Sequence, residues 1–196
     1  MRKNTFHKPI FKNFYRTESL HANSLSSRSE KNSFIPNIMQ NTKNAFKWIV
    51  GILQKNKIPF QFSEEFAAKI YGSNRPLYDI DIEMPDRYFN KLLPHIKDYL
   101  VYGPQRYLDE TFDLLLITLK YEGQKIDISG CETDKLFNHQ TRRWESCSTE
   151  INDVVEKKFY GLTVPVIKWK DLVAYKEKIR RPIDIEDIKA ILQKNC

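Results

Sequence analysis

The sequence predicts an α/β (α+β) fold, in which a small mixed sheet is flanked by helices and followed by further helices at the C-terminus. Residues 79–83 and 124–129 alternate isoleucine with polar residues, and this period of two is typical of half-buried strands. Residues 37–55 instead repeat apolar side chains every three or four positions, as an amphipathic helix does. With 196 residues, the chain is long enough for one domain with a hydrophobic core, or for one domain and an arm.

Residues 1–35 are predicted to form a basic, flexible arm, and residues 36–196 the folded domain. Residues 1–45 carry eight basic and two acidic residues, which gives +6 of the chain's net charge of +7. The serine-rich segment 24–29 has no apolar periodicity, which favours a solvated tail. An organelle-targeting segment has a similar composition. Contact with nucleic acid is a more specific alternative role for the arm. No secretory leader is indicated.

After the arm, the sequence predicts a helix, a short strand and a second helix. An apolar stripe indicates a helix from about Asn37 to Lys55, and Ile58–Phe62 follows as a short strand. Ser63 is a favourable N-cap for the next helix, whose first turn carries two glutamates that suit the helix dipole. Gly72 then ends this helix, because glycine readily adopts the left-handed conformation found at helix C-termini.

The strand over residues 79–83 has the sequence Asp79-Ile-Asp81-Ile-Glu83 and is the centre of the functional prediction. Residues two apart on a strand point to the same side, so Asp79 and Asp81 are expected to lie next to each other. Two carboxylates this close repel each other unless a cation lies between them, and Mg²⁺ commonly binds carboxylates together with substrate phosphates. The alternative is a charged strand face exposed to solvent, or a turn.

A helix and a hairpin are predicted to follow this strand. Residues 85–99 have an apolar face that indicates a helix. Residues 111–120 and 124–129 are expected to be two strands of an antiparallel hairpin, with Glu122-Gly123 at the turn. Asp127 in the second strand lies between two isoleucines, in the same pattern as the aspartates of the earlier strand.

The C-terminal third of the sequence is less regular at first and then helical. Within residues 131–157, the segment Thr141–Trp144 either binds an anionic or planar group or forms a loop with a partly packed tryptophan. Residues 161–167 are predicted to be a last strand or an extended connection. Residues 169–178 and 184–192 have the pattern of two helices.

Composition excludes several classes of protein. No apolar run approaches the ~18 residues that a membrane span needs. The three cysteines, Cys131, Cys147 and Cys196, have no metal-ligand spacing and are expected to be free thiols in a reduced, cytoplasmic setting. The four histidines are scattered, which argues against a nucleophilic triad.

One specific motif and two less specific ones resemble a known family. The run Arg75-Pro-Leu-Tyr-Asp-Ile-Asp-Ile82, preceded by Gly72-Ser73, is similar to the core motif of the nucleotidyltransferases related to DNA polymerase β. It is most similar to the small lincosamide and aminoglycoside nucleotidyltransferases and their uncharacterised bacterial relatives. Softer similarities in Val164–Ile167 and in the two C-terminal helices extend the resemblance over about residues 45–194.

The resemblance implies a nucleotidyltransferase-like fold and a metal-dependent transferase. Such an enzyme moves a nucleoside monophosphate from a nucleoside triphosphate, such as ATP, to an acceptor hydroxyl, and pyrophosphate leaves. The acceptor implied is a small molecule, a protein or an RNA. The expected cofactor is Mg²⁺ or Mn²⁺, because two such ions stabilise the attacking and leaving oxygens of this reaction. Nucleic acid is a further partner to consider because of the basic arm, and no membrane partner is indicated.

The family's functional residues can be matched to positions in this chain. Asp79 and Asp81 match the metal ligands, and Asp127 matches the third metal-binding carboxylate, which can also act as general base. Asp113 is the competitor for the third position, and a polar residue facing solvent on an edge strand is the alternative interpretation of Asp127. The residues expected to contact the nucleotide are Gly72, Ser73, Arg75 and Lys176. For Lys176, the alternative is a solvated helix lysine.

The chain departs from the family at one position. The family carries a glycine pair about a dozen residues before its aspartates, so that backbone N–H groups can approach the triphosphate. Here Glu64-Glu65 stand in that place, and their charges would repel a triphosphate. Two interpretations follow, of which an active nucleotidyltransferase is preferred. The other is a pseudoenzyme, in which a catalytically impaired nucleotidyltransferase fold serves as a binding or regulatory protein.

Overall fold

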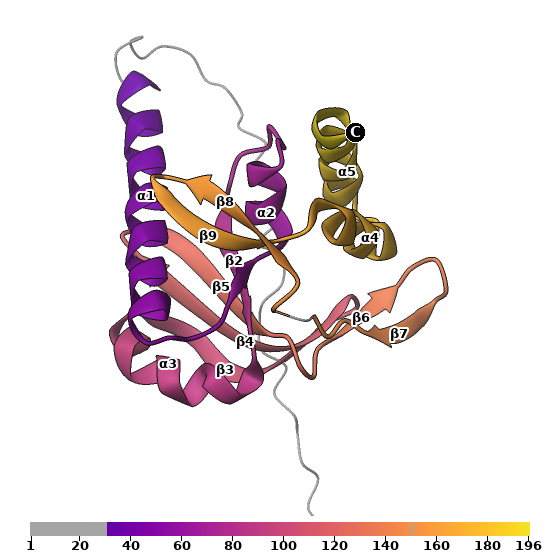
Figure 1. Cartoon of the computed structure of the whole chain (residues 1–196), viewed down its shortest axis with the longest axis horizontal. Coiled ribbons are helices and arrows are strands. Elements are labelled where there is room, and N and C mark those ends of the chain that lie inside the picture. Colours follow the sequence, from indigo (N-terminus) through magenta and orange to yellow (C-terminus); the bar gives the residue numbers. More distant parts are fainter. Residues whose placement is uncertain (1–30, 150) are drawn as a thin grey trace, which may run out of the picture.

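The computed structural model describes residues 31–149 and 151–196 (Figure 1). Residues 1–30, which form most of the predicted basic arm, lie outside the described residues. The helices are α1 (Lys31–Lys55), α2 (Glu64–Ile70), α3 (Phe89–Ile96), α4 (Trp169–Ile179) and α5 (Pro182–Asn195), with short 3₁₀ turns at Asp86–Tyr88 and Lys97–Tyr99. Among these described residues, no helix combines the length and apolar character that crossing a lipid bilayer requires.

The strands of the described residues form one mixed sheet. They are β1 (Gln61–Phe62), β2 (Asp79–Met84), β3 (Leu100–Leu108), β4 (Phe112–Tyr121), β5 (Gln124–Gly130), β6 (Lys135–Asn138), β7 (Arg143–Ser146), β8 (Val154–Phe159) and β9 (Leu162–Ile167). The strand order is β7-β6-β4-β5-β2-β1-β9-β8, and β3 pairs with β4 outside this path. Most neighbours are antiparallel, but β2 pairs with β5, and β1 with β9, in parallel. The predicted α/β fold with a small mixed sheet is therefore confirmed.

The core lies where α1, α2 and α3 cover one face of this sheet. Phe46 from α1 stacks on Phe62 and Phe66, with ring centroids 5.3 and 5.5 Å apart. On β2, Ile80 and Ile82 are almost fully buried, whereas Asp79 and Asp81, which alternate with them, are half-buried. The alternation in the sequence thus sorts apolar side chains to the core and carboxylates to the opposite face. In Figure 1, α4 and α5 pack together on the side of the molecule away from α1.

Most elements agree with the sequence prediction, and the hairpin of β4 and β5 is confirmed. The first helix begins at Lys31 instead of Asn37, and the strand predicted from Ile58 is confined to β1. The helix predicted over residues 85–99 is divided into α3 and two flanking 3₁₀ turns. Residues 161–167 form a strand, β9, and both C-terminal helices are present.

The prediction missed the peripheral strands. Of the segment Thr141–Trp144, for which a loop was one prediction, Arg143 and Trp144 belong to β7, while β3, β6 and β8 were not predicted. β3 lies at a sheet edge and is largely exposed on both faces, so its sequence lacks the alternation that marks a half-buried strand. Trp144 in β7 is 43% exposed and meets Phe137 edge to face, which agrees with a partly packed tryptophan. Pairing, and not amphipathicity, makes these segments strands.

Candidate active site

β2 and β5 bring three carboxylates together on the face of the sheet opposite the core. The two strands are parallel neighbours, with Asp81 directly opposite Asp127. Asp79, Asp81 and Asp127 each offer a carboxylate oxygen, and these oxygens all lie within 4.8 Å of one another. We call these three residues the acidic triad. Asp113, the competitor for the third position, lies on β4 and pairs instead with Arg106.

Burial and mutual repulsion govern the protonation of Asp79 and Asp81. Burial, followed by the negative charge of Asp79, raises the pKa of Asp81 well above its ordinary value. Burial also raises the pKa of Asp79, although the cation of Lys125 opposes this shift. Three carboxylate oxygen donors in a half-buried site fit a hard divalent cation such as Mg²⁺, whose charge would relieve both effects.

Two neighbours fix the carboxylate of Asp127. Thr118, opposite it on β4, donates its hydroxyl to Asp127 Oδ1 at 2.7 Å. Lys125, two residues earlier on β5, places Nζ 2.5 Å from Asp127 Oδ2 and 3.3 Å from Asp79 Oδ2. The sequence prediction missed Lys125 as part of the site. The spacing of Lys125 and Asp127 was a usable signal, because residues two apart on a strand share a face.

The start of α2 lies against Asp81. The backbone N–H groups of Glu65 and Phe66 donate to Asp81 Oδ2, at 3.0 and 3.2 Å. Glu64 has a φ of +46°, in the left-handed region that glycine occupies without steric cost. The position where the resembling family has glycine therefore keeps a glycine-like backbone, although a glutamate occupies it.

The side chains of Glu64 and Glu65 are bound to other residues of the protein. Glu64 accepts a hydrogen bond from the hydroxyl of Tyr175 on α4 and lies 3.6 Å from Arg181. Glu65 accepts hydrogen bonds from the backbone N–H of Tyr78, at 2.7 Å, and from Arg75, at 3.3 Å. Glu64 is thus held by Tyr175 and Arg181, and Glu65 by Tyr78 and Arg75.

The residues predicted to contact the nucleotide lie in a buried ion-pair network. We use this name for Arg75, Lys176 and Arg181 together with Glu64, Glu65, Asp184 and Asp187. Asp187 accepts hydrogen bonds from Ser73 Oγ, at 2.7 Å, and from Arg75, at 2.8 Å. Lys176 is 1% exposed, so it is not a solvated helix lysine, and its Nζ lies 3.0 Å from Asp187. The structure thus places Ser73, Arg75 and Lys176 around Asp187, beside the acidic triad and not in it.

Gly72, the remaining predicted contact, has a backbone role at the end of α2. Its φ is +113°, and a Cβ atom there would lie 2.2 Å from Cδ of Lys194 on α5. The end of the helix predicted at Tyr71-Gly72 is confirmed, but Tyr71 is the C-cap and Gly72 follows it. The positive φ of Gly72 favours glycine at this position.

Arg181 is a second cation that the sequence prediction missed. Its guanidinium lies 2.7 Å from Asp184. Burial raises the pKa of Asp79, and the positive charge of Arg181 is close enough to oppose part of this rise. Arg181 begins the Arg-Pro-Ile-Asp run that resembles the end of the family, but the sequence prediction gave it no role in the site.

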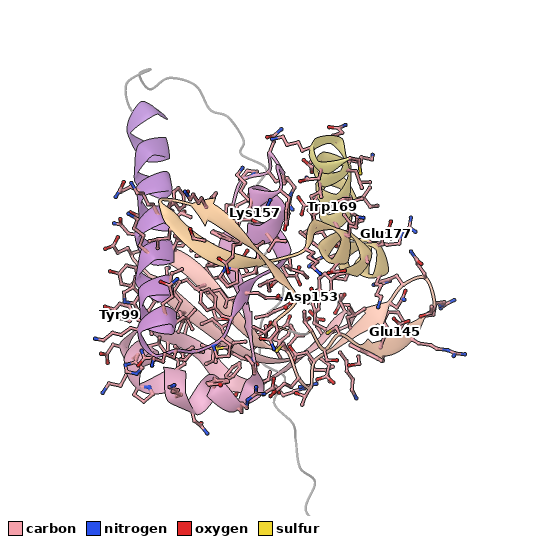
Figure 2. All side chains as sticks on the ribbon, in the orientation of Figure 1. Tyr99, Glu145, Asp153, Lys157, Trp169 and Glu177 are labelled. Atoms are coloured by element: carbon pink, nitrogen blue, oxygen red, sulfur yellow. The ribbon has the colours of Figure 1, made fainter. Side chains whose placement is uncertain are left out.

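A cavity of about 390 Å³ lies farther along the same face of β2. Its lining includes Ser63, Glu64, Glu83, Cys147, Asp171 and Tyr175. Glu83 follows Asp81 by two residues and points to the same side of β2. Because Glu83 lines the cavity, the cavity begins two residues along the strand from the acidic triad. Figure 2 marks Asp153, another lining residue, and Glu145 on β7, which lies 3.3 Å from Lys178 of the lining.

Glu83 should make stability depend on pH in a defined direction. Burial raises its pKa from 4.5 to about 7, while a hydrogen bond from Gln61 opposes the shift. As pH rises above 4.5 the unfolded chain loses this proton first, so the contribution of Glu83 to stability is lost between pH 4.5 and about 7. We expect Glu83→Gln to be more stable than the native chain by about 1–3 kcal/mol at pH 8 and by much less at pH 5.

Urea unfolding of both proteins at several pH values measures this difference. Glu186→Gln, at an exposed position on α5, is the matched control and should follow the native profile. A constant difference between Glu83→Gln and the native chain from pH 5 to pH 8 would contradict the prediction.

Comparisons with known proteins identify the fold. No protein-family model matches the chain, and a search of curated protein sequences also gives no match. Among solved structures, a provisionally assigned nucleotidyltransferase from Thermotoga maritima is similar, with a TM-score of 0.59 and 16% identity, covering 78% of this chain and 92% of that one.

Two antibiotic-modifying enzymes are similar to a lesser degree. Lincosamide adenylyltransferase LnuA, bound to lincomycin, has a TM-score of 0.52 and 13% identity, covering 76% of this chain and 96% of its own. ANT(2″)-Ia, in complex with adenylyl-2″-tobramycin, has a TM-score of 0.52 and 12% identity, covering 78% of this chain and 88% of its own. The chain has the nucleotidyltransferase fold, and the resemblance noted in its sequence is confirmed at the level of the fold.

Proposed function

We propose that this protein is a metal-dependent nucleotidyltransferase, which moves a nucleoside monophosphate from a nucleoside triphosphate to an acceptor hydroxyl. The observation that carries this proposal is the acidic triad, formed by Asp79 and Asp81 on β2 and by Asp127 on β5, which lies opposite Asp81. Its position in a nucleotidyltransferase fold supports transfer chemistry over an unrelated surface cluster of acids.

Asp79 and Asp81 would hold the divalent metal, with Asp127 as the third ligand. Bound ions of this kind stabilise negative charge on the attacking and leaving oxygens. Asp127 is also the base that would take the proton of the acceptor hydroxyl, since Thr118 and Lys125 already orient its carboxylate. Thr118 would hold this carboxylate in place through the reaction.

ATP and a hydroxyl-bearing small molecule are the first substrates to test. LnuA is described as a lincosamide antibiotic adenylyltransferase, and ANT(2″)-Ia is in complex with adenylyl-2″-tobramycin. The cavity beside Glu83 is the space we assign to the acceptor, because it opens on the same face as the triad. The assay is pyrophosphate release from ATP and Mg²⁺ with a panel of hydroxyl acceptors that includes an aminoglycoside and a lincosamide.

A second candidate is a catalytically impaired nucleotidyltransferase fold that binds a partner. It is favoured by the glutamate pair and by the backbone of Glu64, which remains left-handed at φ +46° without a glycine. In addition, the first free N–H groups of α2 already bind Asp81, so they are not available to a phosphate. Under this proposal the triad would be a remnant, and function would not need nucleotide.

Calorimetry with ATP distinguishes the two candidates. We expect the native chain to bind ATP only when Mg²⁺ is present, and Asp79→Asn to lose this binding, because the metal joins the carboxylates to the phosphates. The double variant Glu64→Gly/Glu65→Gly should bind ATP at least as well as the native chain, because it removes two negative charges near the phosphates. Binding by the double variant alone would favour the impaired fold, and binding by neither protein would contradict nucleotide transfer altogether.

A further inference from the structure

Lys125 occupies the position between two carboxylates of the acidic triad. In the parallel register it lies directly opposite Asp79, and it precedes Asp127 by two residues on the same face of β5. Its Nζ is 3.3 Å from Asp79 Oδ2 and 2.5 Å from Asp127 Oδ2. The ammonium therefore bridges two carboxylates that belong to different strands.

Electrostatics explain why the ammonium lies there. The carboxylates of Asp79 and Asp127 would repel each other without a cation between them, and the ammonium of Lys125 is that cation. A lysine ammonium is a compact charge on a flexible four-carbon stem, so it can leave these carboxylates without any movement of the strand. The side chain of Lys125 is 48% exposed, which gives the ammonium space toward solvent.

The other cations near the triad are less free to move. Arg75 is bound to Glu65 and Asp187, and Arg181 is bound to Asp184, a buried carboxylate. Lys176 is bound to Asp184 and Asp187 and is 1% exposed. Releasing any of these would take a charged partner from a buried carboxylate, which is costly. Releasing Lys125 exposes only the carboxylates that a metal would neutralise.

We propose that Lys125 is a two-position cation: it rests on Asp79 and Asp127 when no metal is bound, and it contacts the triphosphate once a divalent metal has displaced it. The inference rests on the proposed function, because it takes the acidic triad to be a metal site. Metal binding and ammonium release are then one exchange, in which the carboxylates keep a positive partner throughout. The released ammonium remains tethered beside the site, where phosphate oxygens are its strongest available acceptors.

The exchange predicts opposite effects of one substitution on two ligands. Lys125→Met keeps the length of the side chain but removes the competing charge, so Mn²⁺ alone should bind at least about five-fold more tightly than to the native chain. Inorganic tripolyphosphate should bind the Mn²⁺-loaded variant at least about five-fold more weakly, because its ammonium partner is lost. Electron paramagnetic resonance of free Mn²⁺ measures the first affinity, and calorimetry the second.

Lys120→Met is the matched control, since Lys120 lies opposite Lys125 on β4 and is exposed. It removes the same charge from the neighbouring strand without touching the triad, so both affinities should stay within about two-fold of the native values. Thermal melts of the three proteins verify that each is folded.

Three outcomes would overturn the inference, and they can be told apart. Unchanged or weaker Mn²⁺ binding by Lys125→Met would show that the lysine does not compete with metal. Unchanged tripolyphosphate binding would show that the released ammonium does not contact phosphate. In both cases the metal site of the proposed function would stand, whereas a lack of Mn²⁺ binding by both the native chain and Lys125→Met would overturn the metal site as well.

Discussion

Asp81→Asn is expected to lower nucleotidyl transfer by about two to three orders of magnitude and, at the same time, to raise the stability of the fold. Transfer falls because an amide is a much weaker metal ligand than a carboxylate. Stability rises because the substitution removes a buried charge that Asp79 and Asp127 repel. Burial, followed by this repulsion, is why the pKa of Asp81 is raised. The asparagine oxygen can still accept from the N–H groups of Glu65 and Phe66, so α2 keeps its anchor.

The pyrophosphate-release assay measures the transfer rate, and a thermal melt at pH 7.5 measures stability. Asp113→Asn is the matched control on β4, because Asp113 pairs with Arg106 and lies outside the acidic triad. It should leave the rate within about two-fold of the native value. If Asp81→Asn kept a rate close to that of Asp113→Asn, the triad would have no part in the chemistry.

Lys176→Met is expected to cost about 3–5 kcal/mol of the free energy of unfolding, the largest effect on stability that the structure predicts. Burial by itself lowers the pKa of Lys176, but Glu64, Asp184 and Asp187 together raise it above its ordinary value. Removing the ammonium leaves the carboxylates of Asp184 and Asp187 short of one partner, although both are fully buried. Losing one member of a buried ion pair costs far more than losing an exposed pair.

Urea unfolding of Lys176→Met and Lys178→Met provides the measurement. Lys178 is on the same helix, but its ion pair with Glu145 is exposed, so its loss should change stability by at most about 0.5 kcal/mol. Similar losses for the two variants would indicate that solvent reaches the ion-pair network.

The ion-pair network also links the C-terminal helices to the helix that contacts the acidic triad. It joins the start of α2, through Glu64 and Glu65, to α4 and α5, through Lys176 and Arg181. Because α2 contacts Asp81 directly, the network holds the backbone against which the triad is packed. Arg75 and Lys176 are expected to affect activity through this packing even if they never touch the nucleotide.

The sequence by itself determined the elements whose signals are local. Alternation with isoleucine marked β2 and β5, and it also required Asp79 and Asp81 to share a face. Glu122-Gly123 indicated the turn of the β4–β5 hairpin, and Gly72 the end of α2. The motif around Asp79 identified the fold class before any contact was known. All these features depend on residues that are close in the chain, where period and turn chemistry decide the conformation.

Only the tertiary structure decided which residues and strands contact one another at the site. The parallel pairing of β2 with β5 sets Asp81 opposite Asp127, and it alone brings Lys125 to Asp79. Arg75 meets Asp187 across 112 positions of the chain, so a residue that the motif suggested for phosphate is found in an ion pair. The edge strand β3 likewise exists because β4 pairs with it. These contacts depend on how distant segments pack, and the energy of a charged side chain depends on which charges the fold places beside it.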